Sequence, residues 1–308
     1  MADGLPPLKS KNQDRATLDL SIIIVNWNTK DLLRNCLKSI YRETNGISYE
    51  VFVVDNASSD GSPEMVETEF PKVRRIKNER NLGFARANNQ AFPLSRGRYT
   101  LLLNPDTLIL DKAINRMVRF MDSYPRVGLA GCRLSNPDST LQPSCANFPN
   151  LLNLGLDYLL RLKIFPSAFS GKYLYRLWAH DEIRKVDWVL GAFMIVRREV
   201  IQLTGGLDED YFLCGEDMDW CYGIKEKGWP VLFSPQAQII HYGRQRNPTE
   251  WKVDWSKGVY RANLLFYKKH YGIFSLMLYR VAHHAVSLPK LLLSKISQPL
   301  NKRSRGNK

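Results

Sequence analysis

Cysteine is scarce in this 308-residue sequence, and the few cysteines form no recognisable pattern. There are five of them, an odd number, and no CxxC pair occurs. A disulfide framework or a zinc knuckle needs paired or closely spaced cysteines, so both are excluded as the basis of the fold. Unpaired thiols are typical of a reducing compartment, and we therefore expect a cytoplasmic protein. The cysteines are Cys36, Cys132, Cys145, Cys214 and Cys221.

The sequence also lacks a long uninterrupted apolar run. Residues 1–17 are polar, so they do not have the apolar core of a signal peptide, and we expect a disordered leader. Near the other end, Arg280, His283, His284 and Lys290 interrupt an apolar stripe, which makes it too polar for a membrane span. The overall composition, with 44% hydrophobic and 11% aromatic residues, is ordinary for a globular protein.

Acidic residues are almost absent from the last part of the chain. Residues 251–308 carry twelve lysines and arginines against one acid, whereas residues 1–250 carry 32 basic and 29 acidic residues. The net charge of +14 is therefore concentrated in the tail. An anionic membrane surface, a nucleic acid, or simple solubility would each account for such a tail.

The amphipathic character of the tail bears on which of these explanations applies. One helical face carries apolar side chains, which suits a helix lying in a membrane interface. A helix packed on its own domain would show the same stripe. A nucleic-acid binder would need aromatic and charged side chains on a groove, so we expect no nucleic-acid partner. The stripe consists of Phe274, Met277, Leu278, Val281, Ala285, Leu288 and Leu292.

Short apolar runs alternate with amphipathic helical patterns over the first half of the chain. Runs at 18–25 and 51–54 read as buried strands and runs at 73–77 and 99–103 as further strands, with helical patterns between them. The alternation predicts an α/β fold with one Rossmann-like, mostly parallel central sheet and helices on both faces. We expect the main domain to span residues 18–250 and a basic helical extension to span residues 251–308. Later strands are expected at 188–196, 231–233 and 238–240, with a helix at 216–227.

Polar residues follow several of these strands at the edge where such sheets bind ligands. Asp106, beside a proline that stiffens the turn, could present its carboxylate to Mg²⁺ or Mn²⁺, which are often shared with substrate phosphates. Asp55 could accept the imide N–H of uracil or thymine. Either residue could instead be an ordinary turn aspartate. His241, at the end of a later strand, could complete a metal site or be structural.

Three carboxylates crowd the start of the helix expected at 216–227. Capping of a helix N-terminus accounts for one or two acids, but Glu216, Asp217 and Asp219 are more than it needs. Transfer to a hydroxyl group requires a general base, which a partly enclosed carboxylate can provide. We assign the base to Asp217, with Glu216 as second choice and orienting partner.

Eight features, in order, carry a resemblance to a known family. They are SIIIVNWNT (21–29), VVDNASSDGS (53–62), NERNLGFA (78–85), LNPD (103–106), WVLGAF (188–193), GGLDE (205–209), GEDMDW (215–220) and His241. With this order and spacing, the chain resembles the inverting glycosyltransferases of family 2, which have the GT-A fold. The resemblance is strongest to their bacterial rhamnosyltransferase-like branch.

The resemblance implies a role for each matched position. Asn26, Trp27 and Asp55 would hold the nucleoside of a nucleoside-diphosphate sugar. Asn81 and Gly83 would line the donor pocket. The donor would be deoxythymidine-diphosphate rhamnose or a UDP-sugar, and the acceptor a cell-envelope or lipid-linked glycan reached at the inner membrane face. The sequence makes no prediction of oligomeric state.

The same resemblance implies the catalytic parts. Asp106 matches the metal-binding acid of the family's Asp-x-Asp motif, and His241 matches a third metal contact for Mg²⁺ or Mn²⁺. Asn104 replaces the first acid of the motif, which leaves a neutral ligand or a ribose contact there. Asp217 matches the catalytic base of a single in-line displacement with inversion.

Two other classes of protein remain open. A nucleotidyltransferase can share this kind of sheet, but residues 26–29, after the first strand, contain no glycine where such enzymes carry a Gly-rich basic loop. A sugar-nucleotide-binding protein without transferase activity would be indicated by loss of Asp106 or Asp217, and both are present.

Overall fold

The computed structural model describes residues 18–155, 178–243 and 255–296. The expected leader, residues 1–17, lies outside the described residues. The strands are β1 (Leu18–Asn26), β2 (Tyr49–Asp55), β3 (Arg74–Lys77), β4 (Gly97–Leu103), β5 (Thr107–Ile109), β6 (Leu129–Ser135), β7 (Leu141–Gln142), β8 (Cys145–Ala146), β9 (Arg184–Lys185), β10 (Trp188–Val189), β11 (Phe193–Arg197) and β12 (Val231–His241). The helices are α1 (Lys30–Glu43), α2 (Ser62–Glu69), α3 (Phe84–Ala91), α4 (Ala113–Ser123), α7 (Arg198–Thr204), α8 (Glu216–Glu226), α9 (Trp255–Phe266) and α10 (Gly272–Ile296). A short π-helix (Tyr267–Tyr271), which we call the π-turn, lies between the last two.

One large sheet organises these elements, in the order β3-β2-β1-β4-β11-β6-β12-β5. The first four strands of this order are parallel, as the sequence predicts. Beyond β4 the sheet is mixed, because β11 runs antiparallel to both of its neighbours. Phe193, which opens β11, pairs with Leu103, which ends β4. The chain therefore enters β11 at the carboxyl edge of the sheet and must run back in the opposite direction.

The last strand differs from its expected form. The runs expected at 231–233 and 238–240 are parts of the single strand β12, which pairs with β6 on both sides of an irregularity between Ser234 and Gln238. Pro235 lies within this irregularity and has no N–H to donate to a ladder. The proline interrupts the pairing without ending the strand, and β12 continues to His241 at the site edge.

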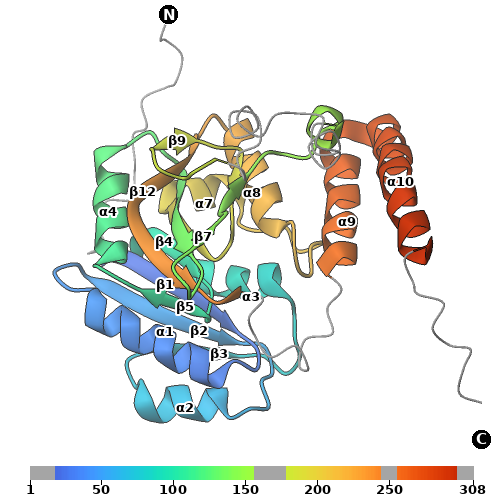
Figure 1. The fold of residues 1–308 in the computed structure, drawn as a ribbon. Helices are drawn as coiled ribbons and strands as arrows, with labels where there is room; N and C mark the ends of the chain where they lie inside the picture. The colour runs from blue at the N-terminus through green and yellow to red at the C-terminus, as the bar shows by residue number, and fades with distance from the viewer. Residues whose placement is uncertain (1–17, 156–177, 244–254, 297–308) are drawn as a thin grey trace, which may run out of the picture.

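Helices cover both faces of the sheet, as expected (Figure 1). Side chains of α1, α2 and α4 contribute to the apolar core on one face, and those of α3, α7, α8 and α9 contribute to the core on the other. The outermost element is α10, which lies beyond α9 at one side of the molecule (Figure 1). None of the described helices is both long and apolar enough to cross a membrane.

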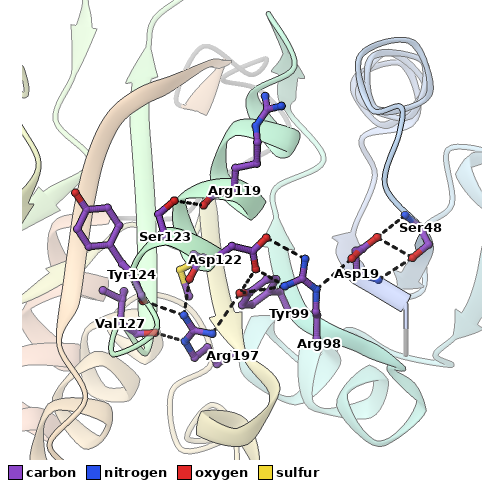
Figure 2. Close-up of polar contacts among 11 residues, drawn as sticks. Asp19, Ser48, Arg98, Tyr99, Arg119, Asp122, Ser123, Tyr124, Val127 and Arg197 are labelled. Atoms are coloured by element: carbon purple, nitrogen blue, oxygen red, sulfur yellow. Dashed lines mark hydrogen bonds and ion pairs between the residues drawn. The ribbon is translucent and has the colours of Figure 1, made fainter. Parts of the chain in front are cut away.

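A polar network closes the edge of the sheet opposite the strand carboxyl ends (Figure 2). Arg197 donates to the backbone carbonyls of Val127 at 2.6 Å and Tyr124 at 2.9 Å, and to the hydroxyl of Tyr99 at 3.2 Å. The Tyr99 hydroxyl in turn donates to Asp122, near the end of α4, at 2.7 Å. Carbonyls at the end of a helix lack partners within that helix, so Arg197 fastens the end of α4 to the sheet.

Arg197→Met should lower the free energy of unfolding by about 2–3 kcal/mol, because it removes the donor to the partly buried Val127 carbonyl and the bonds to Tyr124 and Tyr99 while keeping the length of the side chain. Urea denaturation followed by circular dichroism would measure the loss. Arg198→Met is the matched control, since the one bond of Arg198 to another described residue is a long one, to the Arg96 carbonyl at 3.3 Å. Equal losses in the two variants would contradict the role assigned to Arg197.

Candidate active site

The predicted site residues, from Asn26 to His241, gather at the carboxyl edge of the sheet. Asn26 and Asp55 end the neighbouring strands β1 and β2 and are register partners. Asn104 and Asp106 follow β4, and His241 ends β12. The parallel direction of the first strands is the reason that residues far apart in the sequence meet here.

On the nucleoside side, Asn26 is completely buried and its amide is used within the protein. Its Nδ2 donates to Asp55 Oδ1 at 2.9 Å and to the Ser58 hydroxyl at 3.0 Å, and its Oδ1 accepts from Thr29 at 2.6 Å. Asp55 also accepts from the backbone N–H of Ser58 at 2.9 Å. Asn26 thus holds Asp55 in place, and the carboxylate oxygens of Asp55 retain capacity for a further donor. Trp27 lies beside them and is partly exposed.

The loop before α3 lies against the loop before α8. Gly83 has φ +85°, and a Cβ on it would lie 2.5 Å from the backbone oxygen of Phe212. Asn81 Oδ1 accepts from the Gly83 N–H at 2.9 Å, which fixes the turn. The Phe84 N–H donates to the same Phe212 oxygen at 3.1 Å. Glycine is required at position 83 by this close approach, which joins the expected donor-pocket loop to the segment that carries the acids.

Asp106 and His241 face each other across the site. His241 Nε2 lies 3.5 Å from Asp106 Oδ1, and both side chains are buried. The other carboxylate oxygen of Asp106 accepts from the Gly243 N–H at 3.0 Å. Asn104 Nδ2 lies 3.3 Å from His241 Nε2. The structure therefore brings together Asp106 and His241, which the sequence predicts as metal ligands, and Asn104, which it predicts as a neutral ligand or a ribose contact.

Gln142, which the sequence analysis did not identify, sets the orientation of His241. Gln142 Nε2 donates to Asn136 Oδ1 at 2.9 Å, so its Oε1 is the acceptor for His241 Nδ1 at 2.6 Å. With the proton on Nδ1, Nε2 of the neutral imidazole offers a lone pair toward Asp106 and Asn104. A hydrogen bond of this kind, to the far nitrogen, is typical of metal-binding histidines. Gln142 and His241 are 99 positions apart, and no local motif marks the glutamine.

These donors fit a divalent ion shared with substrate. Within the described residues, no group of three or more His, Cys, Asp or Glu side chains could hold a metal ion alone. Mg²⁺ is usually bound by one or two carboxylates together with substrate phosphates and water. One carboxylate, one oriented imidazole and a neutral amide would leave the remaining positions around such an ion to substrate oxygens and water.

A short backbone path links Asp106 and His241 to the acid cluster. The Asn104 N–H donates to the Ala192 carbonyl at 3.1 Å, and the Gly191 N–H donates to Asp217 Oδ2 at 3.0 Å. The turn between β10 and β11 thus touches the end of β4 on one side and the first turn of α8 on the other. Phe84, after the donor-pocket loop, also borders Gly191, at 3.5 Å from where a Cβ would stand.

Glu216 and Asp217 are buried together at the start of α8, with 6% and 7% of their surfaces exposed. Burial and the neighbouring Asp217 raise the pKa of Glu216 to about 8. Burial also raises the pKa of Asp217, although the backbone N–H groups of Gly191 and Met218 oppose this by donating to its carboxylate. Among the described residues, none hydrogen-bonds to Glu216 Oε2. The pair thus combines a carboxylate stabilised by two N–H donors with a neighbour that favours its protonated form.

This difference makes stability depend on pH. Between pH 4.5, the ordinary pKa, and about 8, the folded protein keeps a proton on Glu216 that the unfolded chain releases. Relative to Glu216→Gln, the wild-type free energy of unfolding should therefore fall with rising pH, by about 1.4 kcal/mol per unit within this window. Urea titrations from pH 5 to pH 9 would measure it. Glu226→Gln, an exposed change at the end of the same helix, should run parallel to wild type.

Comparison with known proteins identifies the family of this chain. The model of glycosyl transferase family 2 matches residues 21–182, more than half of the chain. The chain is 26% identical to the N-acetylglucosaminyl-diphospho-decaprenol L-rhamnosyltransferase of Mycobacterium tuberculosis over 234 residues, which cover 72% of this chain and 76% of that enzyme. It is 24% identical to rhamnosyltransferase WbbL of Escherichia coli over 234 residues, 73% of this chain and 84% of that enzyme.

A solved structure agrees with the sequence matches. The mannosyltransferase PcManGT of Pyrobaculum calidifontis, in complex with GDP-Man and Mn²⁺, superposes with a TM-score of 0.58 over 96% of this chain and 80% of that one, at 18% identity. The likeness confirms the expected GT-A fold. The family match and the two relatives confirm the predicted resemblance, including its rhamnosyltransferase-like branch. The chain belongs to glycosyl transferase family 2.

Proposed function

We propose that this protein transfers a sugar from a nucleoside-diphosphate donor to an acceptor hydroxyl, with inversion at the sugar. The observation that carries the proposal is the contact path from the Asp106–His241 pair, through Asn104 and Gly191, to the carboxylate of Asp217. A site for the leaving diphosphate and a general base are thereby held on one edge of the sheet. Inverting transfer needs these two functions on opposite sides of the reacting carbon.

We assign nucleotide binding, metal binding and proton removal to different side chains. Asp55, held by Asn26, accepts from the base of the nucleotide, and Trp27 borders it. Asp106 and His241 would hold Mg²⁺ or Mn²⁺, which supplies positive charge to the departing diphosphate. Asp217 removes the proton of the acceptor hydroxyl as that oxygen attacks the anomeric carbon.

Two relatives are named rhamnosyltransferases, which supports rhamnose as the transferred sugar. We propose deoxythymidine-diphosphate rhamnose as the donor, with a UDP-sugar as the alternative. The test is a panel of dTDP-, UDP- and GDP-sugars incubated with the protein, with and without Mn²⁺, with released nucleoside diphosphate quantified. Metal-dependent release from one donor, abolished in Asp106→Ala, is the expected result. Binding of nucleotide by calorimetry without release from any donor, even with polyprenyl-diphospho-N-acetylglucosamine added, would overturn the proposal in favour of a binding protein.

We propose a lipid-linked or cell-envelope glycan as the acceptor, reached from the cytoplasmic face of a membrane. The mycobacterial relative is named for a decaprenol-linked substrate. In this chain, α10 supports the idea: the exposed fractions of Ile273, Phe274, Met277 and Val281 are 63%, 72%, 58% and 69%. The opposite side of the helix packs inward through Tyr279, which is 3% exposed.

Charge complements this apolar face. Arg280 is exposed at its border, and Asp254 is the only acid in residues 251–308. An amphipathic helix with an apolar face and basic flanks binds best where anionic lipids meet the acyl chains. We therefore take an anionic membrane surface as the partner of this face.

Phe274→Ser combined with Val281→Ser should reduce flotation with vesicles of phosphatidylglycerol and phosphatidylcholine by about tenfold, since two exposed apolar side chains are lost. Leu203→Ser, at another exposed leucine on the body, is the control. Equal flotation of wild type and the double variant, or flotation equally strong with neutral vesicles, would contradict the membrane proposal.

A further inference from the structure

The third carboxylate of the acid cluster, Asp219, is engaged by the C-terminal segment. Asp219 Oδ1 accepts from the Tyr211 hydroxyl at 3.1 Å and lies 2.7 Å from His270 Nε2. Because the partner is a carboxylate, Nε2 carries the proton and donates. The side chains of His270 and Asp219 are only 20% and 12% exposed, so this bond is largely shielded from water. It ties the π-turn directly to the first turn of α8.

The neighbouring residue makes a second tie. Lys269 Nζ forms ion pairs with Asp208 and, at 2.8 Å, with Asp210. Both acids lie in the segment of residues 205–215 that connects α7 to α8, which we call the acidic loop. Lys269 also lies over the ring of Tyr211, with Nζ 5.4 Å from its centre. Two consecutive residues of the π-turn therefore contact the first half of the acidic loop and the first turn of α8, which follows the loop.

Close packing against α9 reinforces these bonds. A Cβ on Gly215, at the end of the acidic loop, would lie 2.7 Å from the Cβ of Ala262 in α9. Cys214 has φ +72°, in the left-handed region that a non-glycine residue seldom adopts. Such a conformation persists only where the surroundings enforce it. Here α9 and the π-turn supply those surroundings.

The acidic loop contacts the loop around Gly83 and leads directly into the acids of α8, so its conformation affects both parts of the site. Phe212, in the middle of the loop, accepts from the Phe84 N–H, and its ring lies 3.0 Å from where a Cβ on Gly83 would stand. Glu216 and Asp217 follow the loop directly. A shift of the loop would therefore change the position of Asp217 relative to the donor pocket.

We propose that His270, assisted by Lys269, is a positioning residue that fixes the acidic loop and so places Asp217 for proton removal. Residues 255–271 then contribute to catalysis, because they fix the acidic loop that precedes Asp217. They also connect the exposed face of α10 to the catalytic carboxylates. The functional consequence rests on the proposed transferase activity, whereas the restraint on the loop does not.

The test compares His270→Ala and His270→Gln with Lys268→Ala, a neighbouring exposed position on the same π-turn. In His270→Ala, hydrogen exchange of peptides covering residues 205–220 should be about tenfold faster. Its kcat should fall about 10- to 100-fold, with the donor KM within about twofold of wild type. In His270→Gln, the glutamine Nε2 can donate to Asp219, so most of the exchange protection and most of the kcat should be restored. Lys268→Ala should match wild type in exchange and in kcat.

Unchanged exchange in His270→Ala, or an equal effect of Lys268→Ala, would overturn the inference. So would a change in donor KM alone, because the residue would then act on binding. If His270→Ala does not fold, Lys269→Met gives the same comparison through the second tie. If wild type releases no nucleoside diphosphate from any donor, the proposed transferase function fails, and the exchange data still decide whether His270 restrains the loop.

Discussion

Asp217→Asn should lower kcat about 10³-fold while leaving the affinity for nucleoside diphosphate unchanged, because a positioned general base contributes about 10²–10⁴ to rate. Asparagine keeps the shape of the side chain and can still accept from the Gly191 N–H, as Asp217 does at 3.0 Å. It cannot take a proton from an acceptor hydroxyl. Initial rates of nucleoside-diphosphate release with acceptor, together with calorimetry of nucleotide binding, would measure the two quantities.

Two comparisons make this result specific. Glu226→Gln removes a negative charge from the exposed end of the same helix and should leave kcat unchanged. Glu216→Gln should cost less than Asp217→Asn, because a carboxyl with a pKa near 8 is already largely protonated at pH 7. A larger loss in Glu216→Gln than in Asp217→Asn would move the base to Glu216.

Asp106→Asn should abolish the effect of metal on nucleotide binding and reduce turnover by about 100-fold or more, because one of the two proposed metal ligands loses its charge. Calorimetry of nucleoside diphosphate with and without Mn²⁺ gives a readout that does not depend on turnover. In wild type, Mn²⁺ should tighten binding, and in the variant the two curves should coincide.

The control for this prediction is Asp111→Asn, an exposed aspartate a few positions away. Gln142→Ala should have an intermediate effect of about 10- to 100-fold on metal affinity, as is usual for residues that orient a metal-binding histidine. If Mn²⁺ still strengthens nucleotide binding to Asp106→Asn as it does to wild type, the assignment of the metal site to Asp106 and His241 is wrong.

The parallel half of the fold was predictable from the sequence because its signals are local. Runs such as residues 18–25 and 51–54 are apolar and rich in β-branched residues, and each is followed by a polar residue that ends it, Asn26 and Asp55. Parallel strands place their carboxyl ends at one edge. The meeting of Asn26 and Asp55 follows from that pattern alone.

The antiparallel insertion of β11 was not predictable in this way. Its apolar pattern reads equally well in either direction, and only its entry beside the end of β4 decides the direction. Similarly, nothing around Gln142 or His270 distinguishes either residue in the sequence. Their roles depend on contacts with His241 and Asp219, which are distant in the chain.

The C-terminal region shows most clearly what the sequence pattern reveals and what only the tertiary structure decides. Its amphipathic stripe admitted two interpretations, packing on the domain or lying on a membrane, because periodicity reveals a face but not what covers it. In the structure, Phe274 and Val281 of this stripe are exposed, whereas Phe266 and Tyr267, which precede the stripe, are buried against the body.

The sequence by itself therefore determined the family, the strand ends and the identity of the acids, since these depend on short motifs and local periodicity. Only the tertiary structure decided which side chains orient His241, how Glu216 and Asp217 differ, and which helix of the tail stays uncovered. Those properties arise from burial and from hydrogen bonds between distant segments, which exist only once the chain has packed.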